Sequence, residues 1–175
     1  VKAPWFAPAG FHRGGLSSGV AGLPVVAVTH KLTSGDRDDL YEANINPIAS
    51  FPNEGIVIFG QKTLQATKSA LDRINVRRLM LEVKRQVVRV ADKLLFEPNT
   101  SQTRARFISQ VTPLLALIQA QNGVEQFKVV MDDTNNTTED VEANKLNGRI
   151  VVVPTRAIEF IAVDFIITNS GVSFD

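Results

Sequence analysis

Few side chains in this sequence have the type and spacing that catalysis or metal binding requires. His12 and His30 are the two histidines, and they do not stand at the spacing of paired metal ligands. The absence of cysteine excludes disulfides and thiolate chemistry. A Ser/His/Asp triad stays open from sequence alone, but no G-x-S-x-G motif marks a nucleophile. We therefore predict neither a catalytic residue nor a metal site from these side chains.

Two loops carry residues that could bind an ion. The loop that starts at Gly10 (GFHRGGL) has the glycine content of a phosphate-binding loop but lacks its G-K-[ST] ending. An acidic loop could offer oxygen ligands to Ca²⁺, although it lacks the glycine and the distal glutamate of an EF-hand. Its candidate ligands are Asp132, Asp133, Asn135, Glu139 and Asp140. A turn in solvent is the favoured interpretation, so we expect no cofactor and no metal, and we predict that the chain is not an enzyme.

The most informative pattern is a helix predicted for residues 75–96. Its apolar residues recur at steps of three and four, which places them on one stripe of an α-helix: Val76, Leu79, Met80, Val83, Val87, Val90, Ala91 and Leu94. The opposite side carries a basic strip, made of Arg78, Arg85, Arg89 and Lys93. Asn75 is predicted to cap the start of the helix, and Pro98 to prevent its continuation. One face is thus predicted to join the core and the other to meet solvent or a partner.

Three interpretations of the basic strip are open: a solvated face, a docking surface for an acidic protein, or a nucleic-acid contact. Nucleic acid is the least favoured, because the net charge is only +1 at pH 7 and no aromatic residues alternate with the arginines. No apolar run reaches the ~18 residues of a membrane-spanning helix, and no signal peptide is visible at the start. We expect no direct membrane contact. The chain starts at Val1 without a methionine, which suggests a fragment of a longer protein.

The remaining pattern alternates helices with short strands. A second long helix is predicted for residues 101–121, bent or divided by Pro113 and ended by Asn122-Gly123. Short helices are predicted at 36–41 and 138–143, and strands at 24–29, 55–60, 127–131 and 149–153. Residues 44–52 are predicted to be irregular because they contain two prolines. The expected fold class is α/β (α+β): a mixed, mostly antiparallel sheet with two main helices on one face, plus extended N- and C-terminal segments.

Residues 157–168 (AIEFIAVDFIIT) are predicted to form one long final strand. Its two acids, Glu159 and Asp164, have opposite parity, so a single alternation cannot expose both. Either a bulge changes the register between them, or parts of the strand lie in different environments. The simpler interpretation is a long internal strand; the other is that its far end pairs with a sheet in a neighbouring subunit.

Several stretches together resemble the C-terminal part of contractile phage tail sheath proteins. Near the start they are APWFAPAG at 3–10 with Arg13-Gly14, NINPI at 44–48 and GIVIFGQKTL at 55–64. Further on they are INVRRL at 74–79, LFEPN at 95–99, DTNN at 133–136 and PTRAIEFI at 154–161. Each stretch is weak evidence alone, but they occur in the family's order and cover nearly the whole chain.

The resemblance implies a structural subunit that polymerises around a tail tube and contracts to drive the tube through the host envelope. It implies self-association in rings and a helical polymer, contact with the tube protein, and a baseplate and tail terminator as further partners. It also implies a place in the virion tail sheath after synthesis in the host cytoplasm. The alternatives are a sheath subunit of a related contractile injection device (pyocin or secretion type) or a nucleic-acid-binding domain.

The resemblance also divides the chain and assigns its candidate contacts. Residues 1–24 are expected to be an extended or loop segment that follows a missing N-terminal part, 25–168 a single α/β core, and 169–175 a C-terminal arm. The basic strip is the candidate tube-facing surface. The candidate arm residues for contact between subunits are Thr168, Asn169, Gly171, Val172 and Phe174.

Overall fold

The computed structural model describes residues 3–17 and 25–163. These residues contain four α-helices, two short 3-10 helices and four strands. In chain order they are α1 (Ser34–Glu42), β1 (Ile48–Phe51), β2 (Gly55–Ile58), η1 (Ala70–Asp72), α2 (Ile74–Ala91), η2 (Asp92–Leu94), α3 (Ser101–Ala120), β3 (Val124–Val130), α4 (Thr138–Glu142) and β4 (Arg149–Pro154). The fold class predicted from the sequence is confirmed, because helices and antiparallel strands are both present.

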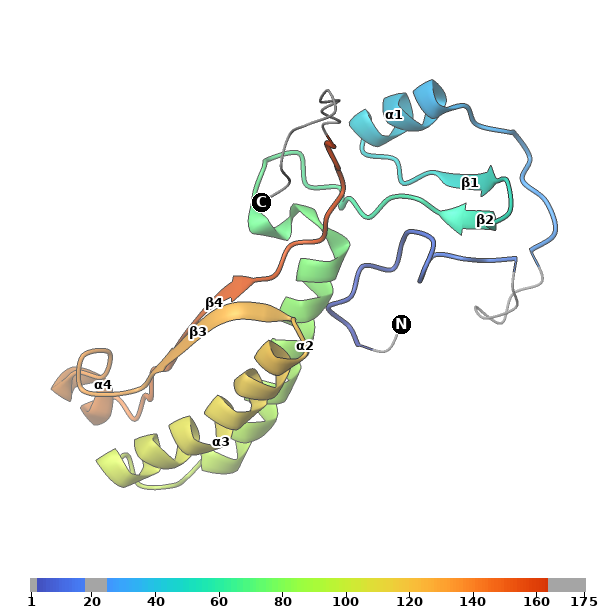
Figure 1. Cartoon of the computed structure of the whole chain (residues 1–175). Coiled ribbons are helices and arrows are strands. Elements are labelled where there is room, and N and C mark those ends of the chain that lie inside the picture. The colour runs from blue at the N-terminus through green and yellow to red at the C-terminus, as the bar shows by residue number, and fades with distance from the viewer. Residues whose placement is uncertain (1–2, 18–24, 164–175) are drawn as a thin grey trace, which may run out of the picture.

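The strands form two separate antiparallel pairs and not the one sheet expected from the sequence. β1 pairs with β2 from Ile48↔Ile58 to Phe51↔Gly55, and β3 pairs with β4 from Val124↔Pro154 to Val130↔Arg149. Figure 1 shows the first pair beside α1 in one lobe and the second pair beside α2 and α3 in another. We call these the small lobe and the helical lobe.

The core lies in the helical lobe, where α2 and α3 pack on one face of the β3–β4 sheet. The stripe predicted for α2 supplies Leu79, Val83 and Val90 to this core, and α3 supplies Phe107, Val111, Leu115 and Ile118. Ala91 is the exception, since it is exposed at the end of α2. The 3.6-residue period therefore predicted the buried face of both long helices.

The start of α2 differs from the prediction that Asn75 caps it. Arg73 is the N-cap residue and makes no side-chain cap hydrogen bond, whereas Asn75 is the second residue of the helix and is buried. The Nδ2 of Asn75 donates to the carbonyl of Thr155, 3.5 Å away. Asn75 therefore ties the helix to the chain that leaves β4.

Residues 3–17 lie against both lobes. The indole Nε1 of Trp5 donates to the carbonyl of Gln121 at 3.1 Å, where α3 ends. Further on, the amides of Gly10 and Leu16 donate to the carbonyls of Ile58 and Ile56 at the edge of β2. This segment therefore connects the end of the core helix to the small sheet.

The strand predictions before α2 are wrong in two places. Residues 25–29 form no strand, while residue 24 lies outside the described residues. β1 was missed because Pro47 and Pro52 were read as breaks in the segment, whereas they stand just before and just after a four-residue strand. Proline at either end of a strand leaves the ladder between them intact.

Candidate functional site

The basic strip lies along the outward side of α2, except for Lys93, which belongs to η2 just after it. Arg85, Arg89 and Lys93 are exposed, and Arg78 is half-buried. The structure thus keeps three of the four predicted side chains accessible. Leu81 and Val88 are also exposed on α2, so apolar surface accompanies the charges.

The charge of Arg85 is partly compensated within its own helix. Its Nε donates to Glu82 at 2.9 Å in an i,i+3 ion pair, and Gln86 donates to the same carboxylate. These hydrogen bonds from Arg85 and then Gln86 lower the pKa of Glu82. Arg89 and Lys93 make no ion pair within the described residues. They are therefore the cations of the basic strip that are best placed to meet an acidic partner.

The chain after β4 does not continue as the predicted long strand. Residues 157–163 are extended but belong to no strand, and residues 164–168 lie outside the described part. The prediction is wrong for 157–163 because this stretch makes no backbone hydrogen bond to the rest of the described residues. The argument from the opposite parity of Glu159 and Asp164 assumed a regular strand with backbone hydrogen bonds to a partner. Residues 157–163 form no such strand.

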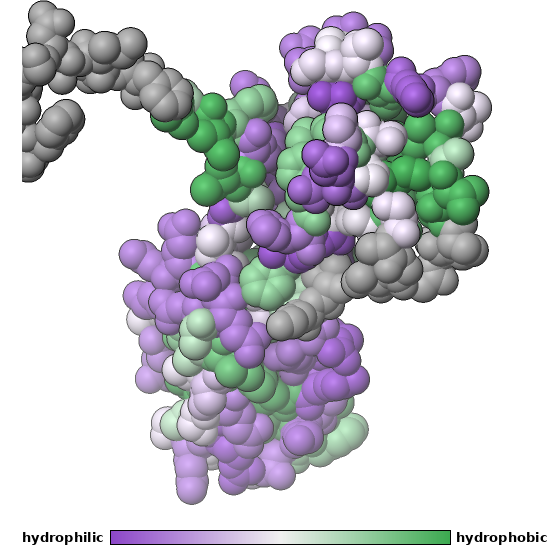
Figure 2. All heavy atoms as spheres, turned by 45° about the vertical axis from the view of Figure 1, so that its right-hand side comes forward, coloured by the Kyte–Doolittle hydropathy of each residue, from purple (hydrophilic) through white to green (hydrophobic). Residues whose placement is uncertain are grey.

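This segment exposes apolar side chains to an unusual degree. Ile158, Phe160 and Ile161 have exposed fractions of 83%, 84% and 80%, and Val163 is also exposed. Figure 2 shows apolar side chains along the surface where the chain leads into the residues drawn in grey. Single exposed apolar residues are common, but several in succession are typical of a surface that meets a partner. The candidate arm residues from Thr168 to Phe174 lie outside the described residues.

Both edges of the β3–β4 sheet carry backbone groups that are unpaired within the described residues. Within residues 3–17 and 25–163, β3 and β4 pair only with each other. Val151 and Val153 of β4 are exposed on the face turned away from α2 and α3. Open edges next to apolar side chains can accept a further strand.

Glu159 is the functional candidate that the sequence only partly signalled. Its carboxylate accepts hydrogen bonds from Arg73 Nε at 2.7 Å and Nη2 at 3.0 Å, and from Gln61 Nε2 at 3.4 Å. The hydrogen bonds that Arg73 donates to Glu159 raise the pKa of Arg73. The sequence showed Glu159 only as a single acidic residue within an apolar stretch. Its partners could not be named because they are about 90 residues away in the chain.

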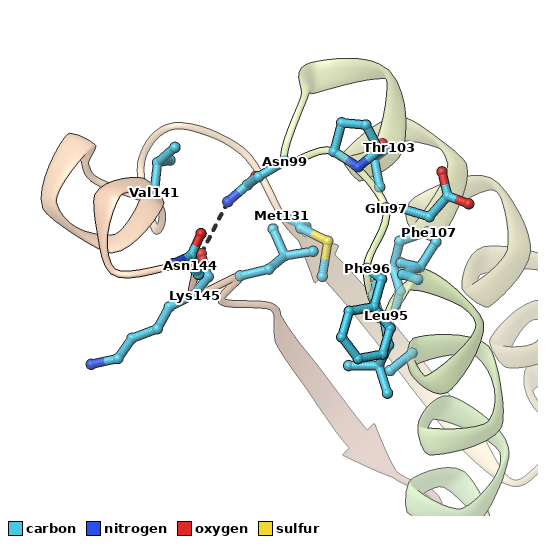
Figure 3. A pocket seen from close by; sticks show the side chains of 14 residues that line it. Leu95, Phe96, Glu97, Asn99, Thr103, Phe107, Met131, Val141, Asn144 and Lys145 are labelled. Atoms are coloured by element: carbon cyan, nitrogen blue, oxygen red, sulfur yellow. Dashed lines mark hydrogen bonds between the residues drawn. The ribbon is translucent and has the colours of Figure 1, made fainter.

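A cavity opens where α2 ends. It has a volume of about 700 Å³ and lies between the loop 95–99, the start of α3 and the chain after α4. Leu94, Phe107 and Met131 make its buried wall apolar, while Leu95 and Phe96 project at its rim (Figure 3). Asn99 closes one side by donating to the carbonyl of Lys145 at 3.0 Å. Such a lining offers mainly apolar contact, with Glu97 and Lys145 as its charged side chains.

The acidic loop is a hydrogen-bonded turn, as the sequence favoured. Asp132 accepts from the hydroxyl and amide of Thr134, and these hydrogen bonds lower the pKa of Asp132. Asp140 caps α4 through the amide and hydroxyl of Thr137. Asp133 pairs with Arg104. The acids therefore face different partners, and no cluster of three metal-ligating side chains occurs in the described residues.

Among the helices of 3–17 and 25–163, none has the length and apolar character to cross a membrane.

A family model described as the phage tail sheath C-terminal domain matches residues 66–168 of the chain. The match covers the helical lobe and the segment that follows β4.

Curated relatives match over a longer stretch. The tail sheath protein of Vibrio phage KVP40 is 40% identical over 174 residues, which is 99% of this chain and 25% of the relative. The tail sheath protein of Enterobacteria phage T4 is 34% identical over 175 residues, which is 100% of this chain and 26% of that protein. The chain thus spans about a quarter of the length of these relatives.

Solved structures share the fold. A sheath complex of an extracellular contractile injection system (PVC), in its contracted state, has a TM-score of 0.80 at 25% identity, over 93% of this chain and 45% of that one. The baseplate of the anti-feeding prophage has a TM-score of 0.80 at 24% identity, over 93% and 44%. At this level of identity the likeness supports the arrangement of helices and strands described above.

Proposed function

The chain belongs to the phage tail sheath C-terminal domain family, and from this membership we propose that it is part of a structural subunit of a contractile tail sheath. In this proposal the whole protein polymerises with copies of itself around a tail tube. Contraction of the polymer then drives the tube through the host envelope. The location is the tail of the virion, after synthesis in the host cytoplasm.

One observation carries the proposal beyond family membership. The segment 157–163 leaves the fold with its apolar side chains in solvent, while the β3–β4 sheet keeps unpaired edges within the described residues. A strand donated by one copy to the sheet of the next would pair the open sheet edge and bury the exposed apolar side chains. Because such a contact joins different surfaces of two copies, its repetition gives rings or helices.

The experiment uses the full-length protein with residues 169–175 deleted. The deletion should abolish sheath polymers in electron micrographs and leave the circular dichroism and the melting temperature of the monomer nearly unchanged. Polymers of normal length after the deletion would contradict the arm assignment.

The basic strip supports a second contact, with an acidic tube surface. Exposed ion pairs contribute ~1 kcal/mol or less each, so such a contact is weak enough to break when the sheath moves. Arg89 and Lys93 are the better test residues because Arg85 already pairs with Glu82. Changing both to glutamine should reduce sheath growth on purified tubes by roughly tenfold at low salt, and less at high salt.

The matched control changes Lys31 and Lys68 to glutamine, since both are exposed and lie outside α2. The control removes the same net charge and should leave sheath growth unchanged. Equal losses in both variants would indicate a general charge effect, and no loss in either would contradict tube docking by the basic strip. The baseplate and the tail terminator are proposed as further partners at the two ends of the polymer.

A related contractile injection device is the second candidate function. The structural likeness to the PVC sheath and the anti-feeding prophage baseplate supports it. The matches to curated phage proteins favour the phage tail, because they reach 40% identity against 25% or less for these structures. Polymers that carry a phage capsid in micrographs of the source particle would separate the two. We propose no enzymatic activity and no nucleic-acid contact for this domain.

A further inference from the structure

The side chain of Glu159 sits in a socket built by three separate parts of the fold. Arg73 stands at the N-cap of α2 and reaches the carboxylate with two nitrogens, at 2.7 and 3.0 Å. Gln61 comes from the loop after β2 and donates at 3.4 Å. Tyr41, in α1, lies near the same carboxylate, and after burial it is the charge of Glu159 that raises the pKa of the phenol. We call Tyr41, Gln61 and Arg73 the Glu159 socket.

The socket itself is held in place from both lobes. Arg73 also contacts Asp72 at 3.3 Å, and Lys62 donates to the carbonyl of Tyr41 and lies over its ring. The carboxylate of Glu159 therefore occupies a defined position relative to α1, β2 and α2. A two-bond pair between a guanidinium and a carboxylate fixes direction as well as distance.

The chain on either side of Glu159 has no comparable anchor. The last backbone hydrogen bond before it is the one from Thr155 to the carbonyl of Gly123, and none follows within residues 156–163. A cavity of about 410 Å³ lies between residues 156–160 and the start of α2, so this stretch is not packed down on the helix. Ile158 and Phe160 are exposed to solvent on both sides of the half-buried acid. Glu159 is thus the one side-chain anchor of this segment in the described residues.

An anchor of this kind lowers the entropy that is lost when two copies associate. A segment that must find a neighbouring copy loses conformational entropy when it docks, and fixing its root before docking removes part of that loss. Fixing the root also raises the effective concentration of the segment at the neighbouring sheet. The apolar side chains beside Glu159 are held away from their own core. They are therefore placed to bind a neighbouring copy.

We propose that Glu159 and Arg73 are positioning residues that set the point and direction from which the C-terminal chain leaves toward a second copy of this protein. The inference rests on the proposed sheath function and deepens it, because it names what presents the arm. The pair acts through the segment and makes no contact with the neighbour itself.

The experiment measures polymerisation of the full-length protein with Glu159→Gln. The variant keeps the size of the side chain and weakens its bonds to Arg73. We expect the critical concentration for polymers, measured by sedimentation, to rise about tenfold, with the melting temperature of the monomer lowered by only a few degrees. Arg73→Lys keeps the charge but loses the two-bond geometry, and it should give a smaller rise.

The matched control is Asp133→Asn, which removes the ion pair to Arg104 elsewhere in the helical lobe. It should lower the melting temperature to a similar degree without changing the critical concentration. The double variant Arg73→Glu, Glu159→Arg restores the attraction and should recover at least half of the lost polymer. Recovery would exclude a simple effect of misfolding on the single variant.

The outcomes separate this inference from the proposed function. If the wild-type protein forms no polymer at all, the proposed function fails. If the wild type polymerises and Glu159→Gln does so at the same critical concentration, only the positioning role is overturned. An equal rise for Asp133→Asn also overturns it, because loss of stability would then explain both results.

Discussion

At the scale of single residues, an asparagine in the left-handed region ends three of the helices, and Phe96 is the exception. Asn44, Asn122 and Asn144 follow α1, α3 and α4 in the left-handed region, with φ of 60°, 58° and 57°. Their neighbours close the last turn by hydrogen bonds such as Gly123 N to Ile118 O at 2.8 Å. Phe96 follows η2 with φ of 68°, although a bulky residue is costly in this region.

Phe96 is fully exposed, so its side chain does not compensate for its backbone conformation within the described residues. Phe96→Gly should raise the free energy of unfolding by about 0.5–1 kcal/mol, because relief of the left-handed conformation exceeds the entropy cost of glycine. Urea denaturation measures the change. Phe96→Ala keeps the strain and is the control, expected to stay within about 0.5 kcal/mol of the wild type. A less stable glycine variant would show that Phe96 makes a contact that matters.

Tyr41 is the single tyrosine of the chain, so tyrosinate absorbance reports on it alone. Burial, followed by the charge of Glu159 and its hydrogen bond, raises the pKa of Tyr41 from 10.0 to about 12. The raised pKa means that the neutral phenol contributes stability that is fully present below pH 10. That contribution is lost as the pH rises from 10 through about 12.

A spectrophotometric titration should therefore find the midpoint near pH 12 while circular dichroism still shows the folded state. In Glu159→Gln the midpoint should fall but stay above 10, because burial is the larger cause of the raised pKa. A midpoint at 10 in the wild type would mean that Tyr41 lies in water and that the socket is open.

At the scale of elements, α3 shows the limit of a sequence rule. The sequence predicted that Pro113 bends or divides this helix, and of these two outcomes the division does not occur, because α3 runs as one helix from Ser101 to Ala120. Pro113 is exposed, so its ring faces solvent and the missing amide hydrogen bond lies on the outer side of the helix. Val111 and Leu115 remain in the core on either side of it. Tertiary packing thus holds a helix that local propensity weakens.

Pro113→Ala should therefore increase stability. Alanine restores the amide donor and removes the clash of the ring with the preceding turn, effects that together amount to about 1–3 kcal/mol. Thermal or urea denaturation of the domain measures the gain. Ala116→Gly, at an exposed position of the same helix, is the control and should lose about 1 kcal/mol. No gain in the proline variant would mean that α3 is already distorted to accommodate the ring.

The elements differ in how well the sequence predicts them, and the reason is the range of their interactions. α2 and α3 were predicted with their buried faces because a 3.6-residue period is a local property of the chain. β1 was missed and residues 157–163 were assigned wrongly, because a strand exists only if a partner strand is present. Four-residue strands such as β1 carry too few residues for alternation to be recognised.

At the scale of the whole molecule, two sets of contacts join the small lobe to the helical lobe. Trp5 and Gly10 connect the end of α3 to β2 through residues 3–17, and Glu159 connects α1, β2 and α2 through its socket. The sequence revealed the basic strip, since charge on one helix face is a local pattern. It could not reveal the Glu159 socket, since that site assembles residues from three distant segments. Contacts of long sequence separation are thus what single-sequence reasoning lacks here.

The exposed segment after β4 gives the test that belongs to the whole molecule. Ile158→Asp together with Ile161→Asp places two charges where the structure has apolar side chains in solvent. The free energy of unfolding of the monomer should change by less than about 0.5 kcal/mol per site, because exposed positions contribute little to the folded state. Polymerisation should be lost, because burying two unpaired carboxylates against a neighbour costs several kcal/mol. Analytical ultracentrifugation of the full-length protein measures both the monomer and the polymer.

Leu64→Asp provides the comparison, since Leu64 is also strongly exposed but belongs to the loop between β2 and η1 and not to the segment after β4. It should leave both stability and polymerisation unchanged. If the segment variant instead unfolds the monomer, Ile158 and Ile161 belong to the core of their own chain. If it polymerises normally, the apolar surface serves something other than a second copy. Loss of polymers with a stable monomer is the result that joins the exposed segment to assembly, because only a contact between copies can depend on side chains that their own fold leaves in water.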